Sequence, residues 1–329
     1  GETSQSFIVP ILDDSAADGE RRLELRLANP QPAGASLGLL TNALLAIVDN
    51  ESFNIPAGSV ETDFLVASGA NDAVHGIALH TNGQFYIAGD FTRVNEQARS
   101  HLARLNANGT LDQNFGADFA INGPVRALDL QEDGRILIAG VFTQVDSLPV
   151  RYLARMTAGG ILDNTFNIGS GADNPIFAVK ETSAGDGRAI LIGGDFSVFN
   201  GVQRRGIARV TEDGRADLTF DPGSGVSGRV LVIEEQRDGK ILIGGEFTAV
   251  NGVPRVNVAR LNTDGSLDRS FDAGLGADGS VRSISIQFDD RILLGGLFTS
   301  VSGVERRHIA RLFPDGTLDT SFDPGAGAD

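Results

Sequence analysis

The sequence predicts an all-β protein, namely a β-propeller built from four-stranded antiparallel blades. Three short landmarks recur together along most of the chain: Gly-x-Phe, Ala-Arg and Asp-x-x-Phe. The phenylalanines of the first landmark are Phe91, Phe142, Phe196, Phe247 and Phe298, which lie 51, 54, 51 and 51 residues apart. A period of this length indicates a repeat architecture, and short apolar runs separated by glycine-rich turns indicate β-blades.

Each of the five repeats contains four segments with strand character. In the fourth repeat they are residues 230–234, 241–243, 258–261 and a short segment that ends at Phe271. The first two are separated by Asp238-Gly239, a pair that supplies the positive φ angle of a hairpin turn. The second segment is apolar at every position. We therefore expect it to be buried on both faces, between two packed sheets.

The turn between the third and fourth segments predicts which charged residues pair. In the fifth repeat it reads Pro314-Asp315-Gly316, which fits a three-residue hairpin loop closed by a left-handed glycine. That loop places Arg311 directly opposite Asp319. The same register predicts five cross-strand ion pairs: Arg104–Asp112, Arg155–Asp163, Arg209–Asp217, Arg260–Asp268 and Arg311–Asp319. Because these residue types recur in every repeat, we interpret them as structural and not catalytic.

The five copies of these landmarks resemble the delta-60 repeat family, propeller-like repeats of large bacterial proteins. The resemblance covers about residues 60–329, so we divide the chain into an N-terminal segment, 1–52, and a propeller, 53–329. A degenerate copy of the last landmark predicts an orphan outer strand at 60–64. A self-contained five-bladed ring would need only one of the strands at 60–64 and 318–322. We therefore expect a longer parent chain that closes a ring of more blades; a closed five-bladed ring is the alternative.

Residues 1–52 do not carry the repeat. An apolar strand precedes Asp13-Asp14, residues 23–27 alternate between leucine and charged side chains, and a further strand closes on residues 49–51. This order resembles the C-terminal part of a Calx-beta domain, a small β-sandwich. In calcium-binding members two acidic turns converge on Ca²⁺, whose preferred ligands are carboxylate oxygens. The resemblance thus implies the candidate ligands Asp13, Asp14, Asp49 and Glu51; the alternative is that they are solvated turn acids.

The composition limits the possible function classes. The chain has 27 basic and 43 acidic residues, a net charge of −16, which argues against nucleic acid or an anionic membrane surface as a partner. No apolar run approaches the ~20 residues that span a bilayer, so we expect no membrane insertion. Cysteine is absent, which excludes Cys-based metal and redox sites. The chain starts at Gly1 without a signal peptide, and we expect it to be a piece of a longer polypeptide with flanking domains.

Two recurrent polar positions are predicted to reach the ligand-binding face of the blades. One follows the strand-ending glycine and holds Asp90, Asp195 and Glu246; the other precedes the third strand and holds Arg99, Arg204, Arg255 and Arg306. Arginines in such a ring can bind acidic sugars or other carboxylates. The alternative, which we favour, is that these arginines pair with neighbouring acids. His101 and His308 share another position, which we interpret as a variable strand site and not as a metal ligand.

These observations favour a non-enzymatic module. An enzyme concentrates unusual polar residues in a few blades, whereas the five repeats look nearly interchangeable. We predict a binding, adhesion or scaffold module whose partner is a protein or a carbohydrate, with no cofactor other than Ca²⁺ in the N-terminal segment. The family resemblance implies a bacterial surface or secreted protein, and hence an extracellular or cell-surface location. The alternatives are a propeller hydrolase or lyase acting on polysaccharide, and a pure spacer.

Overall fold

The computed structural model describes residues 21–26, 42–47, 64, 67–116, 119–182 and 188–327. The chain divides into two compact units, 1–63 and 64–329. In the first unit β1 (Arg21–Arg26) pairs antiparallel with β2 (Asn42–Ile47). The candidate calcium ligands Asp13, Asp14, Asp49 and Glu51 lie outside the described residues, as do positions 60–63 of the expected orphan strand.

The second unit confirms the predicted fold class, because it consists of five similar β-blades. Its described residues contain no helix that could cross a membrane. Each blade has a central three-stranded antiparallel sheet. The inner, middle and third strands are, in blade order, β3 (Val74–Leu79), β4 (Phe85–Gly89) and β7 (Leu102–Leu105); β8 (Val125–Leu130), β9 (Ile136–Gly140) and β12 (Leu153–Met156); β13 (Ile176–Thr182), β14 (Ala189–Gly194) and β17 (Ile207–Thr211); β18 (Val226–Glu235), β19 (Ile241–Val250) and β21 (Val258–Leu261); β22 (Val281–Ile286), β23 (Ile292–Gly296) and β26 (Ile309–Leu312).

The fourth strand of each blade is shorter than the sequence suggested. It consists of a single bridge to the third strand, for example Leu261 to Leu267 in the fourth blade. The next residue ends the strand locally: Asp268 Oδ1 accepts hydrogen bonds from Ser270 N at 2.9 Å and from Ser270 Oγ at 2.6 Å. Such an Asx turn diverts the backbone from the ladder. The Asp of Asp-x-x-Phe therefore terminates the strand as well as pairing with arginine.

A small hairpin that the sequence analysis did not predict joins the middle and third strands. In the third blade its central residues, Asn200 and Gly201, have φ angles of 49° and 77°, and two positive values are typical of a type I′ turn. The Asn-Gly pairs at 200–201 and 251–252 were the available signal. The hairpin strands are β5 (Arg93–Val94) with β6 (Gln97–Ala98), β10 (Gln144–Val145) with β11 (Leu148–Pro149), β15 (Val198–Phe199) with β16 (Val202–Gln203), β20 (Val253–Pro254) with the end of β19, and β24 (Ser300–Val301) with β25 (Val304–Glu305).

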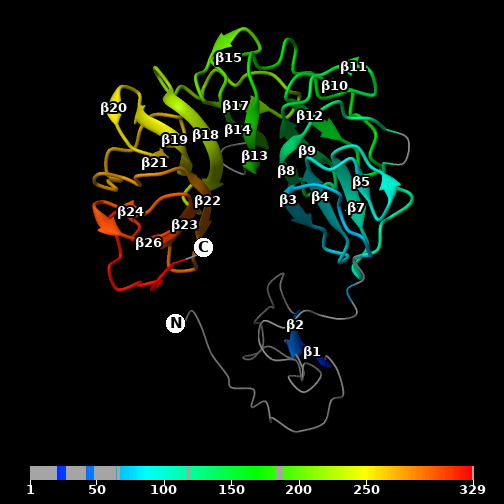
Figure 1. Ribbon diagram of the computed structural model, residues 1–329, viewed down its shortest axis with the longest axis horizontal. Helices are drawn as coiled ribbons and strands as arrows, with labels where there is room; N and C mark the ends of the chain where they lie inside the picture. The colour runs from blue at the N-terminus through cyan, green and yellow to red at the C-terminus, as the bar shows by residue number, and fades with distance from the viewer. Residues whose placement is uncertain are drawn as a thin grey trace, which may run out of the picture. The chain divides into compact units, whose positions relative to one another are not determined.

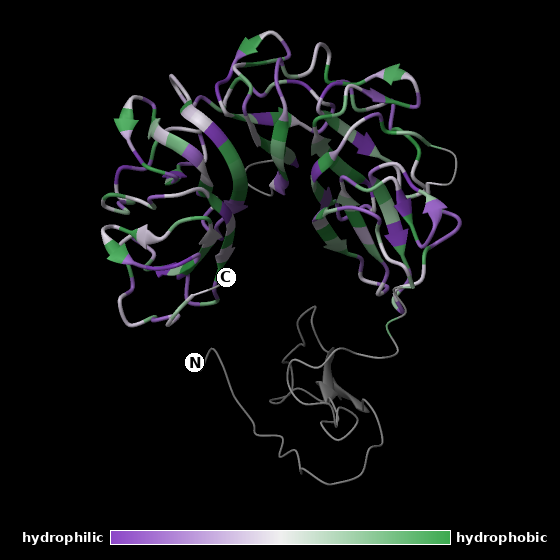
Figure 2. Ribbon diagram, in the orientation of Figure 1, coloured by the Kyte–Doolittle hydropathy of each residue, from purple (hydrophilic) through white to green (hydrophobic). Residues whose placement is uncertain are grey.

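The hydrophobic core lies between neighbouring blades. Leu191, Ile207 and Phe220 of the third blade pack with Ile241 and Ile243 of the fourth, and the other interfaces repeat this arrangement. Figure 2 shows hydrophobic residues along the strands of the blades. This packing explains why the middle strand is apolar on both faces.

The blades follow one another around an arc in chain order, with the inner strands toward its centre (Figure 1). Each inner strand contacts the next, from β3 through β8, β13 and β18 to β22. Side chains on these five strands therefore face a common space, and that space holds the candidate site.

Candidate functional site

The five predicted Arg–Asp pairs are all present. The Nε atom of each arginine donates to Oδ2 of its aspartate at 2.8, 2.8, 2.7, 2.8 and 2.8 Å, from the first blade to the fifth. Each guanidinium also lies over the phenylalanine of its own Asp-x-x-Phe landmark; in the fourth blade Arg260 is 4.9 Å from the ring centre of Phe271. These arginines and aspartates are therefore engaged in holding each blade together. The candidate ligand site must lie elsewhere.

The predicted arginine series lies beside the outer hairpins. Nη1 of each of these arginines donates to the carbonyl of the preceding residue; for Arg255 the distance to Pro254 O is 2.8 Å. Arg204 also lies 3.9 Å from Asp221, an ion pair of the kind that the alternative interpretation expected. Corresponding bonds hold Arg99 and Arg306. Among the described residues no hydrogen bond or ion pair links this series to Asp90, Asp195 or Glu246, so the structure does not bring the two predicted sets together.

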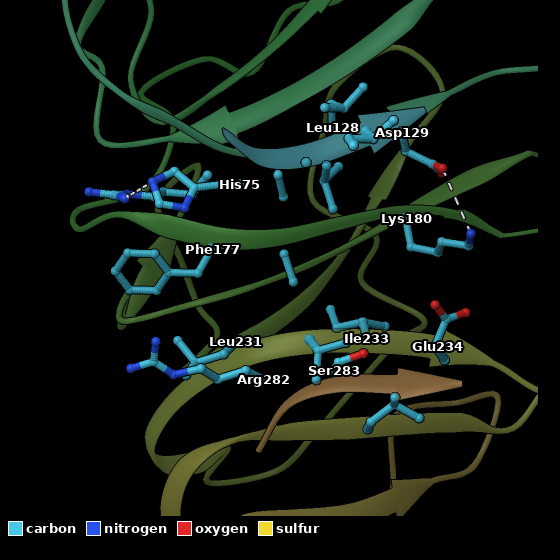
Figure 3. A pocket seen from close by; sticks show the side chains of 18 of the residues that line it. His75, Leu128, Asp129, Phe177, Lys180, Leu231, Ile233, Glu234, Arg282 and Ser283 are labelled. Atoms are coloured by element: carbon cyan, nitrogen blue, oxygen red, sulfur yellow. Dashed lines mark hydrogen bonds and ion pairs between the residues drawn. The ribbon is translucent and has the colours of Figure 1, made fainter. Parts of the chain in front are cut away.

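A cavity of about 990 Å³ in the central space is lined by all five inner strands. Of the predicted acids, Glu246 lines it, and Asp90 and Asp195 pair with residues that line it. Figure 3 shows side chains of β3, β8, β13, β18 and β22 converging on it. Every inner strand has a β-bulge at the same place, and the bulged residue lines the cavity. We call these five residues the bulge ring: His75, Arg126, Phe177, Leu231 and Arg282.

The glycine of Gly-x-Phe is what permits the bulge. A Cβ atom on Gly89 would lie 2.0 Å from the carbonyl oxygen of Ala73, and one on Gly245 would lie 2.0 Å from that of Arg229. The backbone of the inner strand thus approaches the middle strand too closely for any other residue. β-Bulges change the direction in which a side chain points and are frequent beside functional sites. Here they direct five side chains into one cavity, and the fold does not determine which residue types these are.

One end of the cavity carries paired charges. His75 Nε2 lies 2.9 Å from Asp90 Oδ2, and Arg126 Nη1 lies 3.2 Å from Asp90 Oδ1. Burial tends to raise the pKa of Asp90, but the hydrogen bond from His75 and the charge of Arg126 hold this pKa below its ordinary value. Two blades further on, Arg229 pairs with Asp195 at 3.2 Å and with Glu246 at 3.8 Å.

Arg282 differs from the other arginines at this end. Its Nε donates to Ser280 Oγ at 3.3 Å, and in the part of the chain that the structure describes no carboxylate forms an ion pair with it. The position that holds Asp90, Asp195 and Glu246 in other blades holds Leu297 in this blade. Arg282 therefore presents an exposed guanidinium to the cavity, a group suited to a carboxylate or another anion.

A second group, which we call the acid–lysine cluster, consists of Asp129, Lys180 and Glu234. These residues occupy the same register position on β8, β13 and β18, where the first and fifth blades have Ala78 and Ser285. Lys180 Nζ lies 3.7 Å from Asp129 Oδ1, and Glu234 is beside them in Figure 3. This cluster was not predicted, although the sequence has Ala, Asp, Lys, Glu and Ser at this position of the five repeats.

The two carboxyl groups of the cluster have raised pKa values. Burial is the main cause for both, and Lys180 only partly opposes it. For Glu234 the charge of Asp129 raises the pKa further. Half-buried acids of this kind beside a cavity are candidates for binding or catalysis. No group of three or more His, Asp or Glu side chains in the described residues could hold a metal ion.

The shared position of His101 and His308 has a structural role that the sequence analysis did not identify. All five blades have a positive φ angle there, with values of 67°, 67°, 76°, 62° and 67° for His101, Tyr152, Gly206, Asn257 and His308. His101 Nδ1 lies 3.1 Å from Gly89 O, and His308 Nδ1 lies 3.0 Å from Gly296 O. The residue redirects the backbone into the third strand, so the position is a fixed bend and not an ordinary strand site.

A family model described as "Domain of unknown function (DUF5122) beta-propeller" matches the chain in five segments, residues 80–115, 131–166, 185–220, 236–271 and 287–322. The chain belongs to this family. Each DUF5122 match ends on the phenylalanine of Asp-x-x-Phe. None of the matched segments includes the inner strand, so the DUF5122 model covers the scaffold of each blade and leaves out the bulge ring. No curated protein matches the chain in sequence.

Solved structures similar to this DUF5122 chain have low sequence identity. The WD40 β-propeller domain of Doa1 is 14% identical, with a TM-score of 0.37 and coverage of 58% of this chain and 50% of that one. A gluconolactonase from Xanthomonas campestris is 15% identical, with a TM-score of 0.44 and coverage of 68% and 69%. The extracellular domain of a putative hybrid two component system from B. thetaiotaomicron is 14% identical, with a TM-score of 0.48 and coverage of 79% and 33%. The chain thus spans about half of the first and a third of the last.

Proposed function

We propose that this chain is a binding or scaffold module whose ligand occupies the cavity between the inner strands. The observation that carries the proposal is where the blades differ. The Arg–Asp pairs, the landmark phenylalanines and the strand-ending glycines are the same in all five blades, whereas the bulge ring contains a histidine, two arginines, a phenylalanine and a leucine. A pure spacer needs no such difference, and a ligand-binding surface does.

The cavity favours an elongated ligand with an anionic group. Arg282 offers an unpaired guanidinium at one end, and the acid–lysine cluster offers hydrogen-bonding groups at the other. An acidic carbohydrate or a protein segment with a carboxylate has this combination. With the resemblance to delta-60 repeats, the module fits an adhesion or scaffold role on a bacterial surface or in a secreted protein, with an extracellular or cell-surface location.

An alternative function is hydrolysis or elimination on a polysaccharide. The observation in its favour is the acid–lysine cluster, because Asp129 and Glu234 have raised pKa values and face a cavity. A carboxyl group whose pKa is raised toward the working pH is better suited to act as a general acid. We rank this function second, because the lysine of the cluster is partly engaged by Asp129.

A glycan array followed by calorimetry tests both functions. We expect a carboxylate-bearing glycan to bind, Arg282→Ala and Lys180→Ala to weaken binding at least tenfold, and Arg215→Ala, an exposed arginine far from the cavity, to leave it unchanged. Binding that survives both cavity variants would contradict the proposal. Release of reducing ends or unsaturated products, abolished by Glu234→Gln, would instead establish the enzyme.

We also propose that Asp13, Asp14, Asp49 and Glu51 bind Ca²⁺, on the Calx-beta resemblance alone. A calcium titration of a protein that contains the complete sandwich, compared with an Asp13→Asn, Asp14→Asn variant, tests it. The absence of binding heat in the intact sandwich would rule the site out.

A further inference from the structure

The outer flank of the fifth blade is an uncovered copy of a surface that is buried four times elsewhere in the molecule. In the first four blades the arginine of Ala-Arg reaches across to the next blade and donates through Nη1 to a backbone carbonyl. The acceptors are Ala158 O at 2.9 Å, Glu212 O at 2.8 Å, Thr263 O at 2.7 Å and Pro314 O at 2.7 Å. All four carbonyls occupy the same place in the turn between the third strand and the bridge residue.

A second backbone hydrogen bond accompanies the first at three of these interfaces. The residue after the landmark phenylalanine donates its N–H to the next carbonyl of the same turn. These bonds run from Asn167 to Asp213 at 2.8 Å, from Asp221 to Asp264 at 2.7 Å and from Asp272 to Asp315 at 2.8 Å. An x-Asp-Gly turn thus offers two successive carbonyls, and the preceding blade meets them with a guanidinium and a peptide N–H.

In the fifth blade the corresponding donors lack these acceptors. Arg311 keeps its bond to Asp319 at 2.8 Å, but in the described part of the chain no carbonyl accepts from its Nη1 or from Asp323 N. Its side chain is 20% exposed, and the side chains of its four counterparts are between 2% and 17% exposed. The donors therefore point at solvent where a turn would otherwise lie.

The apolar residues of this flank are uncovered in the same way. Leu242, Val258 and Phe271 of the fourth blade are fully buried beneath the fifth. Their counterparts Leu293, Ile309 and Phe322 are only half-buried. At the other end of the arc, Ile77 of the first blade is 69% exposed, although its counterpart Ile284 is buried against the fourth blade.

We infer that this flank, formed by Leu293, Ile309, Arg311 and Phe322, is the docking surface for a sixth blade of the same repeat type. The occupant must bring an apolar inner and middle strand to cover the leucine, isoleucine and phenylalanine, and a turn with two successive free carbonyls to accept from Arg311 and Asp323. A DUF5122-type blade has both. The inference is independent of the ligand in the cavity, since it rests on the blade interfaces.

A designed extension tests this inference. A copy of residues 279–322 fused after Asp329 preserves the 51-residue spacing, because Asp329 corresponds to Asp278. We expect amide hydrogen exchange in β26 and at Phe322 to slow at least tenfold in the extended protein. Unchanged exchange in a folded extension would overturn the inference.

The role of Arg311 is tested by a cycle of variants. Arg311→Met should lower the melting temperature of the extended protein more than that of the original chain, because only the extended protein has the cross-blade bond. Equal shifts would overturn the inference. Light scattering of the original chain adds an independent check: a head-to-tail oligomer that Arg311→Met dissociates would make a second copy the occupant.

The inference remains testable if the extension does not fold. In the original chain Ile309→Lys should lower the melting temperature far less than Val258→Lys, because Ile309 is only half-buried whereas its counterpart Val258 is fully buried and the lysine there should prevent folding of the blade pair. A comparable loss of folding with both variants would mean that the flank is already covered in solution.

Discussion

Removal of the Asp268 carboxylate is the most direct test of the repeated ion pair. Its Oδ2 accepts from Arg260 Nε at 2.8 Å and from Lys240 Nζ at 3.0 Å, and its Oδ1 accepts the two bonds from Ser270. Both the aspartate and Arg260 are less than 10% exposed. In Asp268→Ala the guanidinium stays buried without its counter-ion.

The expected loss of stability depends on the interactions that Arg260 retains in the Asp268→Ala variant. Removing one partner of a buried ion pair costs about 3–5 kcal/mol. Arg260 would still donate to Pro314 O at 2.7 Å and to Gln236 Oε1 at 3.2 Å and would still lie over Phe271. These remaining contacts favour the lower end of that range, so we expect the free energy of unfolding to fall by about 3 kcal/mol. The matched variant Asp217→Ala, in a more exposed pair without a lysine, should cost about 1–2 kcal/mol.

The assay is native-state hydrogen exchange, together with urea unfolding monitored by two probes. Blades unfold with limited cooperativity in repeat architectures, so a single transition cannot be assumed. We expect the loss of protection to be largest in β21 and in the adjoining fifth blade. A cost below ~1 kcal/mol for Asp268→Ala, or an equal cost for Asp217→Ala, would refute the assignment of this pair as a buried structural ion pair.

Three further predictions concern single side chains. Ser147 has a φ angle of 65° in a two-residue turn, so Ser147→Gly should stabilise the protein by ~0.5 kcal/mol in urea unfolding; a loss of stability would contradict this. The pKa of Asp278 is lowered to about 2: burial opposes the shift, but Thr299 and Ser300 donate to the carboxylate. Its stabilising effect should be complete above the unfolded-state pKa of about 3.9 and lost as the pH falls toward 2, whereas an Asp278→Asn variant should lack this pH dependence. Glu234 should have the opposite effect on the pH dependence of stability, because its pKa is raised in the folded protein and stability falls as the pH rises through that pKa. Lys180→Met should raise the pKa of Glu234 further, as measured by an NMR titration.

The sequence specified the scaffold because the scaffold is repeated. Five copies of one turn were enough to derive the register that pairs Arg260 with Asp268, and the distances agree with it. The small hairpin is not evident in the sequence although Asn251-Gly252 is a strong turn signal, because a strand of two residues such as Val253–Pro254 is too short to show an alternating pattern.

The candidate site was harder to predict for a physical reason. The cavity side chains are set by a β-bulge, which shifts the alternation of the inner strand by one residue. A strict period of two therefore does not reveal that Phe177 and Arg282 face the same space. The acid–lysine cluster requires three neighbouring blades to come together, and the near identity of the repeats elsewhere hid the position at which these blades carry Asp, Lys and Glu.

The acceptors at the blade interfaces have a consequence for how such proteins can grow. The four carbonyls that receive the arginine belong to an alanine, a glutamate, a threonine and a proline, so the joint does not depend on the side chain at that point. A gene segment that encodes one blade can then be duplicated in tandem, because each copy brings its own backbone acceptor for the arginine of the preceding blade. The cavity residues can diverge afterwards, one blade at a time, without disturbing assembly.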